Sequence, residues 1–480
     1  MDANEDGKKE ETEATECKGT TTALYMWGYL PGVSSEKSPM LSPVPVRLPD
    51  SVQDGESSWK DVCGGGCGFA MALSENGKLM TWGSAEEEGQ SYVMCGRHGE
   101  IPEAITLPSE AAVVNAVAGW AHCVSVTESG EVYTWGWKEC VPPAKFPRDV
   151  AGGGTFQKDG VGQPIASLVD QATAVTVSHP ENKETIKKRK VSASAKDEYD
   201  SPSPSGDDYF TVLPSLVSLS PGVRITSVAA GGRHTLALSD MGQVWGWGYG
   251  GEGQLGLGSR IKMVSSPRLI TCLELPSSGK DRSSVTQQGS ITPSGEVSKF
   301  PGSFVKEIAC GGRHSAVVTD TGELLTFGWG LYGQCGQGNT SDQLKPTSIP
   351  SLSGVKVKGI AAGLWHTVCV TADGFIYSFG GNQFGQLGTG AEQGEIQPKL
   401  LDAPSLENRL AKMVSCGARH SAVLTEDGQV LCWGWNKYGQ LGLGDSIDRN
   451  IPSLVPTESC QPKYVACGWW HTLLLAETSP

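Results

Sequence analysis

VAAGGRHTLALSDMGQVWGWG, at residues 228–248, recurs in altered form further along the chain. The later copies are IACGGRHSAVVTDTGELLTFGWG at 308–330, IAAGLWHTVCVTADGFIYSFGG at 360–381 and VSCGARHSAVLTEDGQVLCWGW at 414–435. Each copy has two apolar runs separated by a turn rich in Gly and Asp, which predicts two antiparallel strands. The histidines His314, His366, His420 and His471 are 52, 54 and 51 residues apart. This period is typical of a four-stranded propeller blade and not of a helical repeat.

The same pattern occurs less perfectly towards both ends of the chain. VAGWAHCVSVTESGEVYTWGW at 117–137 is a further copy, and CGGGCGFAMALSENGKLMTWG at 63–83 is another, with Phe69 in the histidine position. The C-terminal copy at 465–477 stops before its Trp-Gly strand, and TTALYMWGYLPG at 21–32 supplies one. We therefore expect an all-β, seven-bladed β-propeller of repeats about 51–54 residues long, closed by pairing of the N-terminal strand with the last blade. Closure of this kind leaves no open sheet edge.

Two positions of the repeat recur once per blade. The first is occupied by Phe69 and by His122, His234, His314, His366, His420 and His471, and the second by an aromatic residue before glycine at 27, 82, 135, 247, 327, 379 and 433. Six histidines in one register cannot all belong to active sites, so we interpret them as buried structural residues that hydrogen-bond across neighbouring strands. No carboxylate pair or metal-ligand cluster stands apart from the repeat. The sequence therefore predicts a non-enzymatic protein without catalytic residues, metal or cofactor.

Four units also carry a glycine-rich turn. These turns are GGEGQLGLG at 250–258, YGQCGQG at 332–338, FGQLGTG at 384–390 and YGQLGLGD at 438–445. Together with Gly-x-x-His-[Thr/Ser] and the aromatic-Gly strand, they make roughly residues 22–477 resemble the regulator-of-chromosome-condensation family. The resemblance implies a seven-bladed propeller with a circular face that binds protein partners.

The propeller is expected to be one domain, residues 21–477, with two insertions. His122 and His234 are 112 residues apart, and His234 and His314 are 80 apart, which places extra residues near 140–212 and 277–299. Both segments are rich in charge, Ser or Pro and poor in aromatics, so we expect them to be disordered. The acidic tail at 1–20 is expected to be disordered too.

Charge and composition limit the partners. The net charge of −14 argues against direct DNA binding, which needs clustered Lys and Arg, and is easier to reconcile with a basic protein partner. No apolar run approaches the roughly 18 residues of a membrane span, and no secretory segment opens the chain. We therefore expect no membrane association, and reduced thiols in the cytosol or nucleus.

The two positions before each histidine vary while the residues around them do not. They include Trp120, Arg233, Arg313, Trp365, Arg419, Trp469 and Trp470. The family resemblance places these positions near one face of the ring, and Arg and Trp are frequent interface hot spots. We therefore predict that they form the partner-binding face. The alternative is that the tryptophans pack between blades.

One branch of the family can be compared at the same positions. The plant UV-B photoreceptor carries Gly-Trp-Arg-His-Thr in successive blades, whereas no histidine of this chain follows a Trp-Arg pair. The units of Trp120 and Trp469 are also separated around the ring by the unit of Phe69. We therefore expect that the chain is not a photoreceptor.

A basic run in the first insertion is a candidate nuclear import signal, read by importin. It consists of Lys187, Lys188, Arg189 and Lys190, and Ser192, Ser201 and Ser203 nearby are candidate phosphorylation sites that would add negative charge. The alternative is a solvated charge run without a receptor.

These observations predict a nuclear, chromatin-associated scaffold that binds basic proteins such as core histones. The chain also resembles the plant "tolerant to chilling and freezing" branch of the family, which implies a role in cold-stress gene regulation. The main alternative is guanine-nucleotide exchange on the small GTPase Ran, the founding activity of the family. An adaptor role in a ubiquitin-ligase or membrane-traffic complex is a third.

Overall fold

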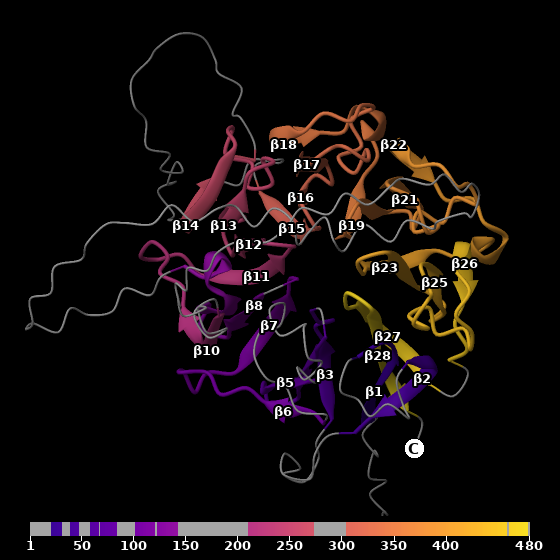
Figure 1. The fold of residues 1–480 in the computed structure, drawn as a ribbon, viewed down its shortest axis with the longest axis horizontal. Helices are drawn as coiled ribbons and strands as arrows, with labels where there is room; N and C mark the ends of the chain where they lie inside the picture. The colour runs from indigo at the N-terminus through magenta and orange to yellow at the C-terminus, as the bar shows by residue number, and fades with distance from the viewer. Residues whose placement is uncertain are drawn as a thin grey trace, which may run out of the picture. The chain divides into compact units, whose positions relative to one another are not determined.

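The computed structural model describes residues 21–30, 39–47, 58–66, 68–83, 101–120, 122–142, 210–272, 304–457 and 460–478. All of them belong to one compact unit, which combines residues 1–144 with 206–480; a second unit, 145–205, lies outside the described residues. Strands β1 to β28 form seven four-stranded antiparallel sheets arranged as blades around a ring (Figure 1). The seven-bladed propeller predicted from the repeat is confirmed.

Each blade runs from an innermost strand beside the ring axis to an outermost strand, and from blade 2 through blade 7 to blade 1 the innermost strands of neighbouring blades contact one another. Blade 1 has β3 (Trp59–Val62), β4 (Ala70–Ser74), β5 (Leu79–Trp82) and β6 (Glu103–Ala104); blade 2 has β7 (Val113–Ala118), β8 (His122–Thr127), β9 (Val132–Trp137) and β10 (Phe210–Leu216); blade 3 has β11 (Ile225–Ala230), β12 (His234–Ser239), β13 (Val244–Gly250) and β14 (Ile261–Ile270). Blade 4 has β15 (Val305–Cys310), β16 (His314–Thr319), β17 (Leu324–Gly328) and β18 (Gln343–Ser348); blade 5 has β19 (Val357–Ala362), β20 (His366–Thr371), β21 (Ile376–Gly380) and β22 (Glu395–Leu400); blade 6 has β23 (Ala411–Cys416), β24 (His420–Thr425), β25 (Val430–Gly434) and β26 (Arg449–Leu454). Short 3-10 turns cover η2 (Lys138–Cys140), η4 (Pro350–Leu352) and η5 (Pro404–Leu406).

Blade 7 closes the ring with strands from both ends of the chain. Its order is β2 (Met40–Val46), β1 (Thr21–Gly28), β28 (His471–Thr478) and β27 (Gln461–Cys467), and Figure 1 shows the indigo N-terminal strands beside the yellow C-terminal ones. The register of β1 on β28 runs from Thr21 opposite Thr478 to Gly28 opposite His471. The predicted closure is confirmed, and the chain also supplies a second N-terminal strand. That strand, β2, contains two prolines, which suit an outer edge because proline lacks a backbone N–H.

The hydrophobic core is divided among the seven interfaces between blades. Each interface holds one cluster; the cluster between blades 2 and 3, for example, combines Val124 and Val132 with Val228 and Trp247. The aromatic residues of the aromatic-Gly pairs are all buried there: Trp27, Trp82, Trp135, Trp247, Phe327, Phe379 and Trp433. The glycine after each has positive φ, 103° at Gly328, a backbone conformation that other residues rarely adopt.

Several sequence expectations lie outside the described residues. The tail at 1–20 and most of the insertions expected near 140–212 and 277–299 belong to this group. The chain leaves the described part after residue 142 and returns at residue 210, between the third and fourth strands of blade 2; it leaves again after residue 272 and returns at residue 304, between blades 3 and 4. In the described part of the chain, no helix has the length and apolar character needed to cross a membrane.

Candidate partner-binding face

The histidine of each Gly-x-x-His loop links its blade to the next one. His234 begins the second strand of blade 3, and its Nε2 lies 2.8 Å from Oγ of Ser315, the residue after the histidine of blade 4. Four further pairs repeat this contact at 2.8 to 3.0 Å: His122 with Thr235, His314 with Thr367, His366 with Ser421 and His420 with Thr472. The pairs therefore connect blades 2 to 7 in sequence.

The glycine-rich turn holds the same hydroxyl from its other side. Ser315 Oγ donates a hydrogen bond of 2.8 Å to the carbonyl of Gln254, so it must accept from His234, whose Nε2 carries the proton. Thr367, Ser421 and Thr472 donate in the same way to the carbonyls of Gln334, Gln386 and Gln440. The recurring Gln itself is explained by its side chain, whose Oε1 accepts the backbone N–H of the residue two positions earlier in the same turn at 2.9 to 3.0 Å.

Burial keeps these imidazoles neutral. It lowers the pKa of His234, His314, His366 and His420 to about 3, and that of His122 and His471 to about 4, from an ordinary value of 6.5. The glycine three residues earlier makes room for each ring: a Cβ on Gly311 would lie 2.3 Å from His314 Cε1 and 2.4 Å from the Gly363 carbonyl of the next blade. The histidines are therefore structural parts of the ring, and no general base is found among them at neutral pH.

Arginines before three of the histidines stack on aromatic side chains. The Arg233 guanidinium lies 4.6 Å from the ring centre of Trp137 and 5.1 Å from that of Tyr249, and it pairs with Glu139. Arg419 is surrounded by three rings, at 5.5, 4.8 and 5.1 Å, which belong to Trp365, Phe384 and Trp435. These contacts hold the guanidinium groups in place, and much of the positive charge interacts with groups of the chain itself.

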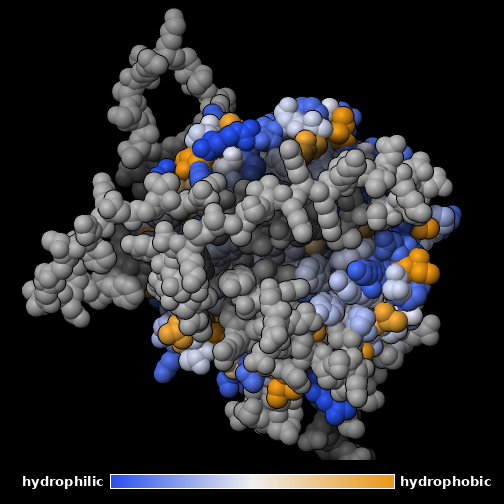
Figure 2. Space-filling view, viewed as in Figure 1, coloured by the Kyte–Doolittle hydropathy of each residue, from blue (hydrophilic) through white to orange (hydrophobic). Residues whose placement is uncertain are grey.

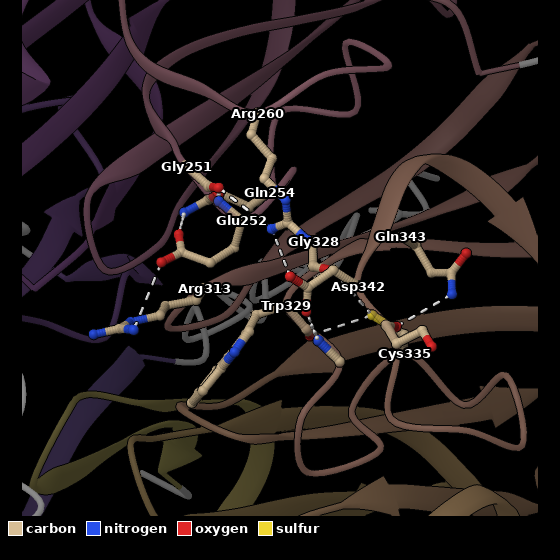
Figure 3. A network of polar contacts seen from close by, with 12 residues as sticks. Gly251, Glu252, Gln254, Arg260, Arg313, Gly328, Trp329, Cys335, Asp342 and Gln343 are labelled. Atoms are coloured by element: carbon tan, nitrogen blue, oxygen red, sulfur yellow. Dashed lines mark hydrogen bonds and ion pairs between the residues drawn. The ribbon is translucent and has the colours of Figure 1, made fainter.

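Arg313 belongs to a polar network between blades 3 and 4 (Figure 3). It lies 3.6 Å from Glu252 and 5.1 Å from the ring centre of Trp329. In the same network Arg260 donates to Asp342 at 2.6 Å, and Asp342 also accepts the Gly330 N–H at 3.0 Å. The acidic partners Glu252 and Asp342 retain only 17% and 16% of their side-chain exposure, so these pairs mainly join the two blades.

Aromatic side chains form a continuous arc across blades 4 to 7 at this end of the ring. Neighbouring ring centres are 4.8 to 6.3 Å apart, and Arg419 bridges Trp365 to the rings that follow. The members of this aromatic arc are Trp329, Tyr332, Trp365, Phe384, Trp435, Tyr438, Tyr29 and Trp470. Trp365 is only 5% exposed, whereas the others are half-buried. We call this end of the ring the loop face.

Most of these aromatics were missed by the sequence reasoning. They occupy two positions of the repeat that can be found by alignment: the residue after the aromatic-Gly pair, as in Trp329 and Trp435, and the residue before Gly-Gln in the glycine-rich turn, as in Tyr332 and Tyr438. Both positions follow strands that end beside the histidine, so they reach the same face.

The structure brings Trp120 and Trp469 together, although the sequence places them in units separated by that of Phe69. Their ring centres are 6.0 Å apart, and the described Gly64–Gly66 segment of blade 1 has no side chains. Blade 1 does lie between the two units, as expected, but this separation of the units does not keep the two indoles apart. Trp469 also lines a cavity of about 60 Å³ at the ring axis, together with glycines and alanines of the loops and with Cys310, Cys416 and Cys467. Burial raises the pKa of these three thiols, to about 12 for Cys310 and Cys467.

Other candidate residues give no site of their own. Within the described ranges, no group of three or more His, Cys, Asp or Glu side chains is placed to hold a metal ion. The predicted import residues Lys187, Lys188, Arg189 and Lys190 and the serines Ser192, Ser201 and Ser203 lie outside the described residues. Exposed hydrophobic side chains appear in Figure 2 as separate orange patches around the ring.

Comparison with known proteins agrees with this architecture. The family model described as RCC1-like domain matches residues 204–479. The ultraviolet-B receptor UVR8 of Arabidopsis thaliana is 29% identical over 418 residues, which cover 87% of this chain and 74% of the receptor. The human E3 ubiquitin-protein ligase HERC2 is 35% identical over 276 residues, 56% of this chain but only 5% of the ligase.

Solved structures show the same fold at lower identity. Prp20p from Saccharomyces cerevisiae, studied for its binding to Gsp1p and histones, has a TM-score of 0.63 and 19% identity, covering 96% of this chain and 92% of its own. Human WBSCR16 also gives 0.63, with 20% identity and coverages of 96% and 100%. Yeast RCC1 (Prp20) bound to Kap60 gives 0.64, with 18% identity and coverages of 100% and 96%.

Proposed function

Because the chain belongs to the RCC1-like family of β-propellers, we propose that it is a nuclear, chromatin-associated scaffold whose loop face binds basic proteins such as core histones. The observation that carries this proposal is the aromatic arc. Seven of its aromatic side chains, spread over four blades, are only half-buried and so are not part of the fully buried core. Aromatic residues are enriched at the centres of protein interfaces. The net charge of −14 favours a basic partner.

The arginines modify the role that we assign to the face. Arg233 and Arg313 have acidic partners within the chain, and Arg419 is stacked among three rings. They therefore hold the aromatic side chains in place, and the aromatic faces and neighbouring carboxylates such as Glu139, 50% exposed, meet the partner. A cation of the partner gains from both groups.

Nucleotide exchange on Ran is the second candidate, and its support is the shared fold. The yeast structure that resembles this chain was studied for binding to Gsp1p as well as to histones, and the chain covers 92% of that protein. An identity of 19% shows the fold alone, and no residue of this chain is assigned to exchange. The ligase activity of HERC2 belongs to a protein of which this chain matches 5%.

Nuclear localisation and its control are part of the proposal. Residues 187–190 would bind importin, and phosphate groups at Ser192, Ser201 or Ser203 would weaken that contact by adding negative charge. A role in cold-stress gene regulation rests only on the sequence resemblance and stays a prediction, as does the expectation that the chain is not a photoreceptor.

The test is to measure histone capture and Ran nucleotide release with the same preparations of the full chain. We expect capture of core histones and no acceleration of GDP release. Replacing Trp435 and Tyr438 with Ala should weaken capture at least about tenfold, since hot-spot residues typically contribute 2 kcal/mol or more. Phe375→Ala is the matched control, because Phe375 is 53% exposed in the turn at the other end of blade 5. Acceleration of GDP release without histone capture would reverse the ranking of the two functions.

A further inference from the structure

We propose that the axial mouth of the loop face binds one lysine side chain, whose ammonium group contacts Trp120 and Trp469. This site deepens the proposed function and rests on it, since the lysine belongs to the basic partner. The two indoles come from blades 2 and 7, and their planes are tilted by 31° at a centre-to-centre distance of 6.0 Å. An ammonium above the axis can therefore lie within about 6 Å of both rings, the range of cation–π attraction.

Small residues surround much of the mouth. At the position that holds Trp120 and Trp469 in their own units, blades 3, 4 and 6 have Gly232, Gly312 and Ala418, whereas blade 5 has Leu364. Gly312, Leu364, Ala418 and Trp469 are among the residues that line the axial cavity of about 60 Å³. The volume exceeds the space for one water molecule several times over but is too small for a drug-sized ligand. A slender side chain with a compact charged end suits it better than a planar guanidinium.

Backbone carbonyls in the cavity lining supply hydrogen-bond acceptors. The carbonyls of Gly231, Gly311 and Gly363, three residues that line the cavity, each accept one backbone N–H of the neighbouring blade at 3.1 Å. A carbonyl oxygen has two lone pairs, so each can accept a second hydrogen bond. An ammonium group donates three.

The groups around the cavity do not repel a cation. The thiols of Cys310, Cys416 and Cys467 keep their protons because burial raises their pKa, and the histidines behind the lining glycines are neutral because burial lowers theirs. Arg233 in blade 3 and Arg313 in blade 4 are paired with Glu139 and Glu252, and Arg419 in blade 6 is stacked among three aromatic rings.

These two indoles also differ from the other aromatics of the loop face. The chain's own cations stack on Trp137, Trp329, Trp435 and Tyr438. No arginine or lysine from the described part of the chain stacks on Trp120 or Trp469. Within the residues that the structure describes, the faces of this pair therefore carry no cation of the chain itself.

The experiment measures binding of the full chain to three fluorescently labelled peptides by anisotropy. They share one Gly/Ala-rich sequence with a single central residue that is lysine, arginine or norleucine, the last matching the lysine stem without its charge. We expect the lysine peptide to bind at least about tenfold more tightly than the norleucine peptide. Equal binding of the lysine and norleucine peptides overturns the proposal, and this comparison needs no variant protein. Tighter binding of the arginine peptide overturns the choice of lysine.

Variants then place the site. The double variant Trp120→Ala, Trp469→Ala should bind the lysine peptide as weakly as the norleucine peptide, whereas Phe375→Ala should bind it like the wild type. Phe375 is the control because it is also an exposed aromatic residue but lies in the turn at the other end of blade 5. Wild-type binding by a double variant with an unchanged melting temperature overturns the site. If that variant still captures histones as the wild type does, only this inference fails; if the wild type captures none, the proposed function fails as well.

Discussion

The buried histidines link the stability of the ring to pH. Their pKa is about 3 or 4 in the folded protein and 6.5 when they are exposed. Below pH 6.5 the unfolded chain therefore binds protons that the folded chain does not. The free energy of unfolding consequently decreases as the pH is lowered. Their contribution to stability is complete above about pH 6.5 and is lost progressively towards pH 4 and 3.

We predict a melting temperature that falls steeply as the pH is lowered from 7.5 to 4.5, measured by circular dichroism at constant ionic strength. Each histidine contributes a slope of up to about 1.4 kcal/mol per pH unit in this window. His366→Phe removes one titrating group and one hydrogen bond, and Phe69 shows that a ring in this register can hold phenylalanine. The variant should melt earlier at pH 7.5 but lose less stability on acidification. Parallel curves for the two proteins would contradict this explanation.

Among the elements, blade 1 is the most weakly linked to its neighbours. Five of the seven interfaces between blades have a histidine–hydroxyl pair, and the two without one flank this blade. Ala70 stands where the hydroxyl partner of His471 would be, and Phe69 replaces the histidine that would face blade 2. The strands of blade 1 are also short, at four, five, four and two residues.

We therefore predict that blade 1 opens before the rest of the ring. Backbone amides of β4 and β5 should exchange with deuterium faster than those of β20 and β21 in blade 5, as measured by mass spectrometry. Ala70→Thr should slow exchange in blade 1, because the new hydroxyl faces His471 and one hydrogen bond contributes about 1 kcal/mol. At the corresponding position of blade 5, the Thr367 hydroxyl lies 2.8 Å from Nε2 of His314, and we expect the same contact between the substituted side chain and His471. Uniform protection of all blades would show that these pairs do not decide local stability.

The second and third strands of each repeat could be predicted from the sequence, whereas the outermost strands could not. The second and third strands of each repeat are buried on both faces and read as apolar runs between glycine-rich turns, as in His314–Thr319 and Leu324–Gly328. The outermost strands, such as Gln343–Ser348 and Glu395–Leu400, bury no residue completely and contain proline, so they carry no hydrophobic pattern. Only their place in the blade makes them strands.

At the scale of the whole molecule, the number of repeats in the sequence predicts the closed ring but not how the side chains are arranged on its loop face. Seven aromatic-Gly positions and an orphan N-terminal strand require a closed ring, whatever the loops contain. The contact between Trp120 and Trp469 depends instead on side chains that converge on the axis over a glycine segment, a relation that spacing along the chain does not encode. The stacking of Arg419 likewise needs residues from two blades, Trp365 and Trp435.

The last prediction concerns closure, on which the whole ring depends. β1 lies inside blade 7, paired with β2 on one side and β28 on the other, and buries Leu24, Met26 and Trp27. Deleting residues 1–32 should therefore abolish cooperative unfolding, since it exposes the edge of β28 and removes part of two interblade clusters. Deleting residues 1–18, which precede β1, should leave the melting temperature unchanged and serves as the control. β2 also accepts hydrogen bonds from the Gly444 N–H of blade 6 and the Trp59 indole of blade 1, so deletion of 1–46 should be at least as harmful as deletion of 1–32. Equal melting temperatures for the full chain and both shorter deletions would mean that the ring holds without its N-terminal strand.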